Sequence, residues 1–179
     1  AANHLSGENG TKFSVVRYGN VIGSRGSVVP LFKKMIAEGS EYLPITDRRM
    51  TRFWITLDQG VSFVLSCLGI MRGGEIFVPK IPSMRVEEIA KILAPNIKHK
   101  ITGIRPGEKL HEMMITSEDS RNTVDLGDRY VIEPSVAFWD RKSFKDDGAI
   151  LVEEGFTYSS DTNDFWLDKG MFLSMLDDM

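Results

Sequence analysis

The sequence predicts an α/β fold in which parallel strands are covered by helices. Short apolar segments typical of buried strands alternate with longer segments whose apolar residues recur at helical spacing. Glycine and proline mark most junctions between them, and no internal repeat is present. A chain of 179 residues can bury one sizeable core. This alternation of strand and helix signals is typical of the α/β class.

The first predicted unit is a strand, a glycine-rich turn and a helix. Residues 13–18 form an apolar run that predicts a buried strand. A turn rich in glycine follows, and a helix is expected over residues 29–37. Pro30 lies near the start of that helix, where its fixed φ is favourable, and Gly39 is suited to the C-terminal cap.

The middle of the chain predicts two helices separated by a strand. Thr56 and Gln59 have the spacing of a capping box, and the apolar residues that follow share one helical face up to Gly73. Residues 75–79 predict a short strand that ends at a proline. A second amphipathic helix is expected over residues 86–93.

The last third of the chain predicts shorter elements. A strand is expected over residues 100–104, and a helix directly after it over residues 108–115. Residues 129–132 predict a last strand at the edge of the sheet. Residues 140–164 are polar and rich in turn formers, and residues 165–176 predict a terminal helix.

Composition is that of an ordinary globular protein, with 42% apolar and 26% charged residues. No apolar run is long enough for a membrane span, and no signal-peptide pattern is present at the start. Cys67 is the only cysteine, so we expect no disulfide framework. It lies in an apolar helical stretch, which favours a small buried residue over a nucleophile. These features favour a cytoplasmic location.

Charge is distributed unevenly over a net charge of −3. Residues 1–110 contain 16 Lys and Arg against 9 Asp and Glu, and the remainder is acidic. The basic part is too weakly charged, and lacks the interleaved aromatic residues, for a nucleic-acid surface. It therefore favours a small anionic ligand. The three histidines do not have the spacing of a metal site, so no metal ligand is assigned.

The glycine-rich turn leaves three interpretations open. Gly19, Gly23 and Gly26 follow a strand, as in a dinucleotide-binding fold, but their spacing is not G-x-G-x-x-G. The acidic residue expected at the end of a second strand is also missing. A loop that contacts a substrate and a plain strand-to-helix turn without a ligand remain the alternatives.

Two arginine-containing segments could bind a diphosphate. Residues 47–53 place three guanidinium groups in a loop, and a guanidinium is well suited to bind phosphate oxygens in pairs. Arg105 and Glu108 lie where a strand is expected to end, and ligands bind at such ends in open α/β sheets. A solvated basic loop and a surface salt bridge are the corresponding structural alternatives.

Several separated motifs resemble the extended short-chain dehydrogenase/reductase superfamily. They are residues 17–21 (Arg-Tyr-Gly-Asn-Val), 24–27 (Ser-Arg-Gly-Ser) and 50–54 (Met-Thr-Arg-Phe-Trp). Residues 76–84 and 104–112 closely resemble its branch of inverting UDP-N-acetylglucosamine 4,6-dehydratases. The resemblance reaches residues 158–163, so it covers nearly the whole chain. It implies the carboxyl-terminal part of a Rossmann-like fold with a small substrate-binding subdomain.

The resemblance also implies a division of the chain. In the superfamily, the cofactor-binding glycine turn and a Tyr-x-x-x-Lys pair precede the Arg-Tyr-Gly-Asn-Val motif, so the chain resembles the carboxyl-terminal half. No catalytic residue is assigned in it, and the chain alone is expected to be inactive. Residues 1–40 would end the Rossmann-like sheet, residues 41–135 would bind the UDP-sugar, and residues 136–179 would be a polar tail with a terminal helix.

The implied reaction uses NADP, with NAD as the alternative. Hydride leaves C4 of the hexose, water is lost across C5–C6, hydride returns to C6, and C5 is reprotonated on the opposite face. The product would be a 4-keto-6-deoxy UDP-sugar for pseudaminic acid and flagellar glycans. A UDP-sugar epimerase, a dehydratase with epimerase activity, and a truncated non-catalytic UDP-sugar-binding module remain alternatives. The full-length protein is expected to form a homo-oligomer, without nucleic-acid or membrane partners.

The resemblance assigns binding roles to matching positions of this chain. Arg52 and Arg105 would hold the diphosphate, Glu108 the uridine ribose, and residues 24–28 would wrap the substrate. Lys109 and His111 are expected on a solvated helix face. The expected substrate-binding residues are Asn20, Ser24, Arg25, Gly26, Ser27, Val28, Arg52, Arg105 and Glu108. The expected cofactor-binding residues are Tyr18, Gly19, Asn20 and Val21.

Overall fold

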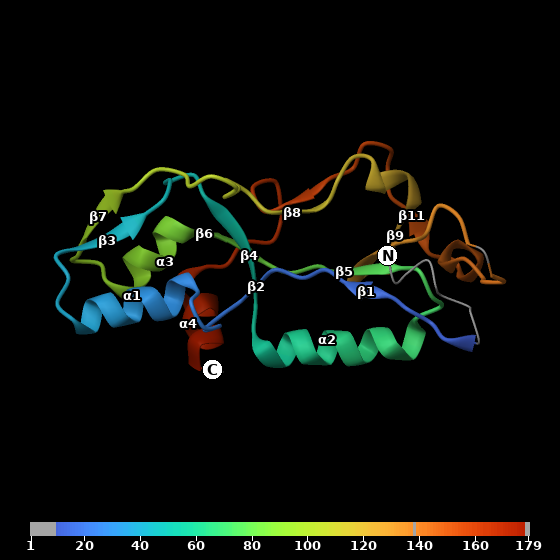
Figure 1. The fold of residues 1–179 in the computed structure, drawn as a ribbon, viewed down its shortest axis with the longest axis horizontal. Coiled ribbons are helices and arrows are strands. Elements are labelled where there is room, and N and C mark those ends of the chain that lie inside the picture. Colours follow the sequence, from blue (N-terminus) through green and yellow to red (C-terminus); the bar gives the residue numbers. More distant parts are fainter. Residues whose placement is uncertain (1–9, 138, 178–179) are drawn as a thin grey trace. The chain divides into compact units, whose positions relative to one another are not determined.

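The computed structural model describes residues 10–137 and 139–177, and in them the chain forms two compact units. Figure 1 labels the helices and most of the strands. The first unit contains the residues up to Tyr18, Asp58–Lys80 and Met113–Tyr158, and the second contains Gly19–Leu57, Ile81–Glu112 and the residues from Ser159 onward. Each unit is thus assembled from separate segments. The expected functional division at residues 40 and 135 stays a prediction.

The first unit contains a mixed five-stranded sheet in the order β1-β5-β10-β9-β11. β1 runs parallel to β5, whereas β5, β10, β9 and β11 pair antiparallel with one another. The elements of this unit are β1 (Val15–Val16), α2 (Leu57–Ile70), β5 (Ile76–Pro79), β8 (Met113–Ile115), the 3-10 helix η3 (Asp119–Asn122), β9 (Thr123–Asp125), β10 (Arg129–Ile132), the 3-10 helix η4 (Phe144–Asp147) and β11 (Ile150–Leu151).

A buried carboxylate fixes the start of β5. The Glu75 side chain is fully buried and accepts hydrogen bonds from the Ser14 hydroxyl (2.5 Å) and the backbone N–H groups of Arg72 (2.6 Å) and Gly73 (2.9 Å). The Arg141 guanidinium, itself buried, pairs with it at 3.1 Å. A buried charge is tolerated only when it is paired and hydrogen-bonded in this way. These contacts tie the segment before β1 to the turn before β5.

Cys67 packs in the apolar core of the first unit together with Phe77, Val124, Val131 and Phe144. Its side chain is buried, and this burial raises the pKa of the thiol. The expectation of a small buried residue is therefore confirmed.

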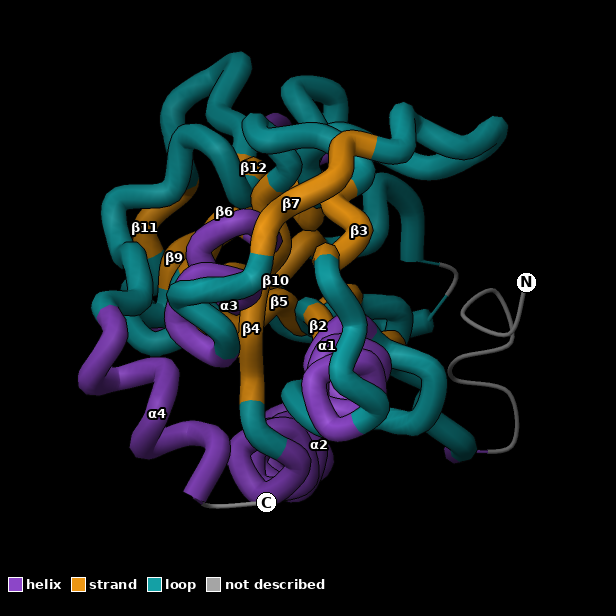
Figure 2. Tube along the Cα trace, turned by 90° about the vertical axis from the view of Figure 1, so that its left-hand side faces the viewer, coloured by secondary structure: helices purple, strands orange, loops and turns teal. Residues whose placement is uncertain are grey.

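The second unit combines a three-stranded sheet with a parallel strand pair and three helices. In the sheet β2-β4-β6, β2 is parallel and β6 antiparallel to β4. Figure 2 shows α1 and α3 near the β3–β7 pair. The elements are β2 (Asn20–Val21), α1 (Val28–Ala37), β3 (Tyr42–Ile45), β4 (Thr51–Ile55), β6 (Ser83–Arg85), α3 (Val86–Leu93), β7 (Lys98–Ile101) and α4 (Lys169–Asp177). β12 (Tyr158–Ser159) has one residue in each unit, because the first unit ends at Tyr158 and the last segment of the second unit begins at Ser159.

The helices of the second unit bury one apolar face each. Phe32 of α1, Ile89 of α3 and Phe172 of α4 are fully buried in one apolar cluster with Leu43 and Trp54. The α/β class, α1 and α3 are confirmed, and α4 begins four residues later than predicted, at Lys169. No helix among the described residues combines the length and apolar character that crossing a membrane requires.

Two sequence predictions about the strands are wrong. The sheets are mixed rather than parallel, because β5, β10, β9 and β11 form an antiparallel series. The strand over residues 129–132 is not an edge strand, since β10 is paired on both sides. Alternating apolar residues predict that a strand forms but do not specify its neighbours.

The helix predicted over residues 108–115 is absent, and β8 occupies residues 113–115. The carbonyl groups of Lys109 and Leu110 accept hydrogen bonds from the Arg52 guanidinium rather than from N–H groups four residues on. Long-range contacts therefore override the local helical pattern here. His111 is correspondingly not on a solvated helix face, because its Nδ1 lies 2.8 Å from the Thr51 hydroxyl.

One face of α2 remains exposed within the described residues. Val61, Leu65 and Leu68 lie at helical spacing and are 49%, 62% and 60% exposed. Exposed apolar strips of this kind mark interfaces or promote aggregation. We therefore predict that residues 1–179 expressed alone are largely insoluble, and that Leu65→Lys combined with Leu68→Lys raises the soluble fraction.

The matched control is Leu43→Lys, which places the same charge at a fully buried position and should lower the soluble fraction further. Soluble yield and sedimentation velocity measure both effects. A monomeric sedimentation profile with a cooperative thermal transition for the unchanged chain would contradict this prediction.

Candidate ligand cavity in the second unit

A cavity of about 250 Å³ lies within the second unit. It is formed by β2, the turn into α1, β3, β4, the start of α3 and the segment after β7. The residues that line it are Asn20, Gly26, Ser27, Val28, Leu31, Phe32, Pro44, Thr46, Met50, Arg52, Trp54, Val86, Thr102, Arg105 and Glu108.

The cavity brings together most of the expected substrate-binding residues. Those that line it are Asn20, Gly26, Ser27, Val28, Arg52, Arg105 and Glu108. Ser24 and Arg25 are exposed in the turn before α1 and do not line it. Of the expected cofactor-binding residues, Asn20 alone lines it. The binding roles of all these residues stay predictions.

Gly19 has a structural reason to be glycine. A Cβ atom at this position would lie 2.6 Å from the Cβ and the carbonyl oxygen of Phe53, so the backbone before β2 packs directly on β4. Any larger residue would push these two segments apart. This packing accounts for the glycine without a cofactor.

β4 presents alternate residues to the cavity. Met50, just before the strand, and then Arg52 and Trp54 line it, whereas Thr51 and Phe53 do not. This is the period of two that places every second side chain of a strand on one face. Asn20 of β2 is paired in register with Trp54, which brings its side chain to the same cavity.

The Arg52 guanidinium is mostly occupied by contacts within the protein. Nη1 donates to the carbonyl oxygens of Thr51 (2.7 Å) and Leu110 (3.0 Å), and Nη2 donates to that of Lys109 (2.7 Å). Nε lies 3.3 Å from a Glu112 carboxylate oxygen. Burial lowers the pKa of Arg52, and Glu112 and Glu108 partly offset that effect. Arg52 therefore holds the segment after β7 against β4.

A network of hydroxyl groups supports this arrangement on the other face of β4. The Thr51 hydroxyl lies 2.7 Å from that of Ser160 and 2.8 Å from His111 Nδ1. The Glu112 N–H donates to the Ser160 hydroxyl at 2.9 Å, and its carbonyl accepts from the Ser160 N–H at 2.8 Å. Residues 109–112 are thus held from both faces of the strand.

Arg105 and Glu108 form a tight turn at the cavity. The Glu108 N–H donates to the Arg105 carbonyl at 3.0 Å, and the Arg105 N–H donates to the Glu108 carboxylate at 3.2 Å. Gly107 has a φ of 81°, which only glycine adopts readily. In the described part of the chain, the exposed Arg105 guanidinium has no hydrogen bond or ion pair. It is therefore available to an anionic ligand.

The other two arginines of the basic loop are paired with acidic side chains. Arg49 pairs with Asp47 at 2.8 Å, and Arg48 lies 3.6 Å from Glu87. The hydrogen bond from Arg49 lowers the pKa of Asp47 to about 2. This loop is consequently neutralised locally, and neither Arg48 nor Arg49 lines the cavity.

The N-terminus of α1 also faces the cavity. Ser27 is the N-cap residue, but its side chain caps no backbone N–H group, and its buried hydroxyl has no partner among the described residues. The first turn of α1 contains no acidic residue. Free N–H groups at a helix N-terminus attract anions. The cavity thus combines this terminus with the Arg105 guanidinium.

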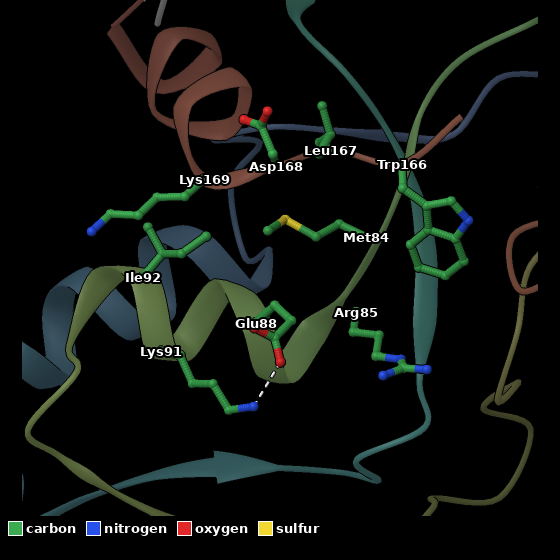
Figure 3. Close-up of a pocket in the computed structure, with 9 residues that line it drawn as sticks. All are labelled: Met84, Arg85, Glu88, Lys91, Ile92, Trp166, Leu167, Asp168 and Lys169. Atoms are coloured by element: carbon green, nitrogen blue, oxygen red, sulfur yellow. Dashed lines mark hydrogen bonds and ion pairs between the residues drawn. The ribbon is translucent and has the colours of Figure 1, made fainter. Parts of the chain in front are cut away.

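A second pocket of about 510 Å³ lies between α3 and the start of α4, also in the second unit (Figure 3). Figure 3 shows Lys91 paired with Glu88, at a distance of 2.6 Å. The Trp166 N–H donates to the Asn163 carbonyl at 2.5 Å. None of the expected site residues lines this pocket. The smaller cavity is therefore the candidate site, and within the described residues no cluster of potential metal ligands is present.

The profile of one family, described as "Polysaccharide biosynthesis protein", matches residues 1–134. The chain belongs to this family. It is 54% identical over 98% of its length to the UDP-N-acetylglucosamine 4,6-dehydratase (inverting) of Campylobacter jejuni, covering 54% of that protein. It is 44% identical over 69% of its length to the UDP-glucose 4-epimerase of Rickettsia canadensis, covering 37% of it. The chain thus spans about half the length of the first of these curated relatives.

Solved structures share the fold. Pen from Bacillus thuringiensis is 31% identical, with a TM-score of 0.81 over 99% of this chain and 53% of its own. DesIV, a dTDP-glucose 4,6-dehydratase from Streptomyces venezuelae solved with NAD and TYD bound, is 22% identical, with a TM-score of 0.56 over 76% of this chain and 43% of its own. The expected fold class and the resemblance to inverting 4,6-dehydratases are confirmed.

Arg52→Met removes the hydrogen bonds that hold residues 109–112 against β4. We predict that the amides of Thr51, Glu112 and Ser160, which bond within this arrangement, then exchange with solvent at least about 10-fold faster. Hydrogen exchange measured by NMR or mass spectrometry tests this. Arg49→Met, at an exposed ion pair, is the matched control and should leave these amides unchanged. Equal protection in the two variants would contradict the assigned role of Arg52.

Proposed function

We propose that the full-length protein is an NADP-dependent UDP-N-acetylglucosamine 4,6-dehydratase that inverts C5, and that this chain holds the UDP-sugar. The observation that carries the proposal is the 54% identity over 98% of the chain to an enzyme of that description. The cavity supports it, because it gathers seven expected substrate-binding residues around a free guanidinium and a helix N-terminus. The product would be a 4-keto-6-deoxy UDP-sugar for pseudaminic acid and flagellar glycans.

In this proposal the chain binds and orients the substrate. Arg105 pairs with the diphosphate, and the N-terminus of α1 with Ser27 donates to phosphate oxygens. Glu108 accepts from the ribose hydroxyls with the carboxylate oxygen that does not bond to the Arg105 N–H. Arg52 keeps Arg105 and Glu108 in place through residues 109–112. Such positioning raises the rate because it holds the hexose in line with its hydride acceptor.

The cofactor and the acid–base groups are proposed to be held mainly by residues outside this chain. When bound, NADP, or NAD as the alternative, would supply the hydride acceptor and donor for this reaction. Of the residues here, Asn20 fits a position beside the sugar, since its side chain lines the cavity. The chain alone is proposed to be inactive, and the full-length enzyme to be a cytoplasmic homo-oligomer.

An epimerase is the second candidate, because the chain is also 44% identical to a UDP-glucose 4-epimerase. The two activities are separated by their products. We predict that the full-length protein with NADP converts UDP-N-acetylglucosamine to a product whose ¹H NMR spectrum contains a C6 methyl doublet. A nuclear Overhauser contact between H3 and H5 then reports the configuration at C5, because the two protons lie on the same face of the ring only when C5 is not inverted. Conversion to a C4 epimer with an intact C6 hydroxymethyl group would show that the protein is an epimerase rather than a dehydratase.

Arg105→Ala tests the binding role of this chain. We predict that the variant full-length protein binds UDP about 10- to 150-fold more weakly, because a charge-assisted hydrogen bond to phosphate is lost. Isothermal titration calorimetry measures the affinity. The control is Lys109→Ala, four residues further along the chain. It also removes a positive charge, but from a side chain that does not line the cavity, so this variant should bind UDP normally. Equal affinity of Arg105→Ala and the wild type would exclude Arg105 from the site.

A further inference from the structure

Two buried polar atoms, each in a residue that lines the candidate cavity, have no partner in the described part of the chain. They are the indole Nε1 of Trp54 and the hydroxyl oxygen of Ser27. The Trp54 side chain is only 1% exposed, and it packs in the apolar cluster of the second unit. Ser27 belongs to the expected substrate-binding residues. Trp54 does not, so its indole group has no assigned role.

An unpaired buried donor is unfavourable and rare. Most buried side-chain polar atoms in folded proteins have a hydrogen-bond partner, and a buried tryptophan N–H usually finds one. Trp166 of the same unit follows this rule, since its N–H donates to the Asn163 carbonyl. The missing partner of Trp54 therefore points to a group that enters the cavity.

The chemistry of the cavity defines that group. The indole N–H can only donate, so its partner must be an acceptor. Free donors at the cavity also include the Ser27 hydroxyl, the α1 N-terminus and the Arg105 guanidinium, whereas the Asn20 and Thr46 side chains, which also line it, can both donate and accept. Glu108 is the only carboxylate that lines it, and it already accepts from the Arg105 N–H. An anionic group rich in acceptor oxygens matches this excess of donors.

We propose that the Trp54 indole N–H donates a hydrogen bond to a diphosphate oxygen of the bound nucleotide. This inference rests on the proposed function, and it adds a recognition residue on β4 to those expected. Trp54 lies two positions after Arg52 on the face of β4 that lines the cavity. One strand thus supplies both the side chain that fixes the ligand-binding loop and a donor for the ligand. The competing interpretation is that Trp54 only fills the core and that its N–H bonds to a buried water.

The test uses the full-length protein labelled with ¹⁵N. The indole resonance of Trp54, assigned through its own backbone, is followed during titration with UDP, with inorganic pyrophosphate and with uridine. Affinities for UDP are measured by calorimetry for the wild type, Trp54→Phe and Trp166→Phe. Trp54→Phe removes the N–H and keeps an aromatic ring. Trp166→Phe is the matched control, because it removes a tryptophan N–H that is already paired and does not line the cavity.

We expect the Trp54 indole resonance to shift with UDP and with pyrophosphate but not with uridine. Trp54→Phe should bind UDP about 10- to 150-fold more weakly, as for the loss of one hydrogen bond to a charged acceptor, and Trp166→Phe should bind normally. The melting temperature of ligand-free Trp54→Phe should stay close to that of the wild type, since the removed donor has no partner there. If this variant does not fold, the wild-type titration decides alone.

Each of the other outcomes contradicts a specific part of these proposals. UDP binding with an unshifted indole resonance and normal affinity of Trp54→Phe would leave Trp54 a core residue and the proposed function intact. A shift with uridine but not with pyrophosphate would place the acceptor on the nucleoside and overturn the diphosphate contact. Absence of UDP binding by the wild type would overturn the proposed function and this inference together.

Discussion

The Arg52 guanidinium is the interaction on which the candidate site depends. It joins β4 to residues 109 and 110 through their carbonyl groups, and it pairs with Glu112. These contacts replace the backbone hydrogen bonds that a helix would have made in the same segment. Because the segment is fixed immediately after Glu108, the exposed turn of Arg105 and Glu108 is held at the cavity. A buried cation with several acceptors is well suited to this role, since its charge is compensated where it lies.

The arginines of the two segments considered for diphosphate binding consequently divide into two groups with different electrostatic roles. Arg48 and Arg49 have acidic neighbours, and Arg52 has carbonyl groups together with Glu112. Arg105 keeps its guanidinium free in the described structure. A ligand phosphate would therefore gain most from Arg105, because a cation that is already paired offers less net attraction to a further anion. The count of arginines in the sequence overstated the positive charge that the site presents.

Elements with strong local signals could be predicted from the sequence. The helix that follows the glycine-rich turn and the amphipathic helix after β6 were found where expected, because caps, proline and apolar spacing act within a few residues. The helix expected at residue 108 does not form, since the competing interactions come from Arg52 and Ser160, which are remote in sequence. The neighbours of β10 were mispredicted for the same reason. Local sequence patterns do not specify which strands pair with one another.

The candidate site was predictable to the extent that its residues lie in motifs shared with relatives. Asn20, Ser27, Arg105 and Glu108 lie in such motifs and meet in one cavity, although they come from three separate parts of the sequence. Trp54 also lies in such a motif, but a large aromatic side chain in a strand is typical of the apolar core, and the structure does place Trp54 in the core cluster. Only the structure separates the buried ring from its unpaired N–H group. A signal was nevertheless present, because Met50, Arg52 and Trp54 alternate along β4, and the face that carries Arg52 must also carry Trp54.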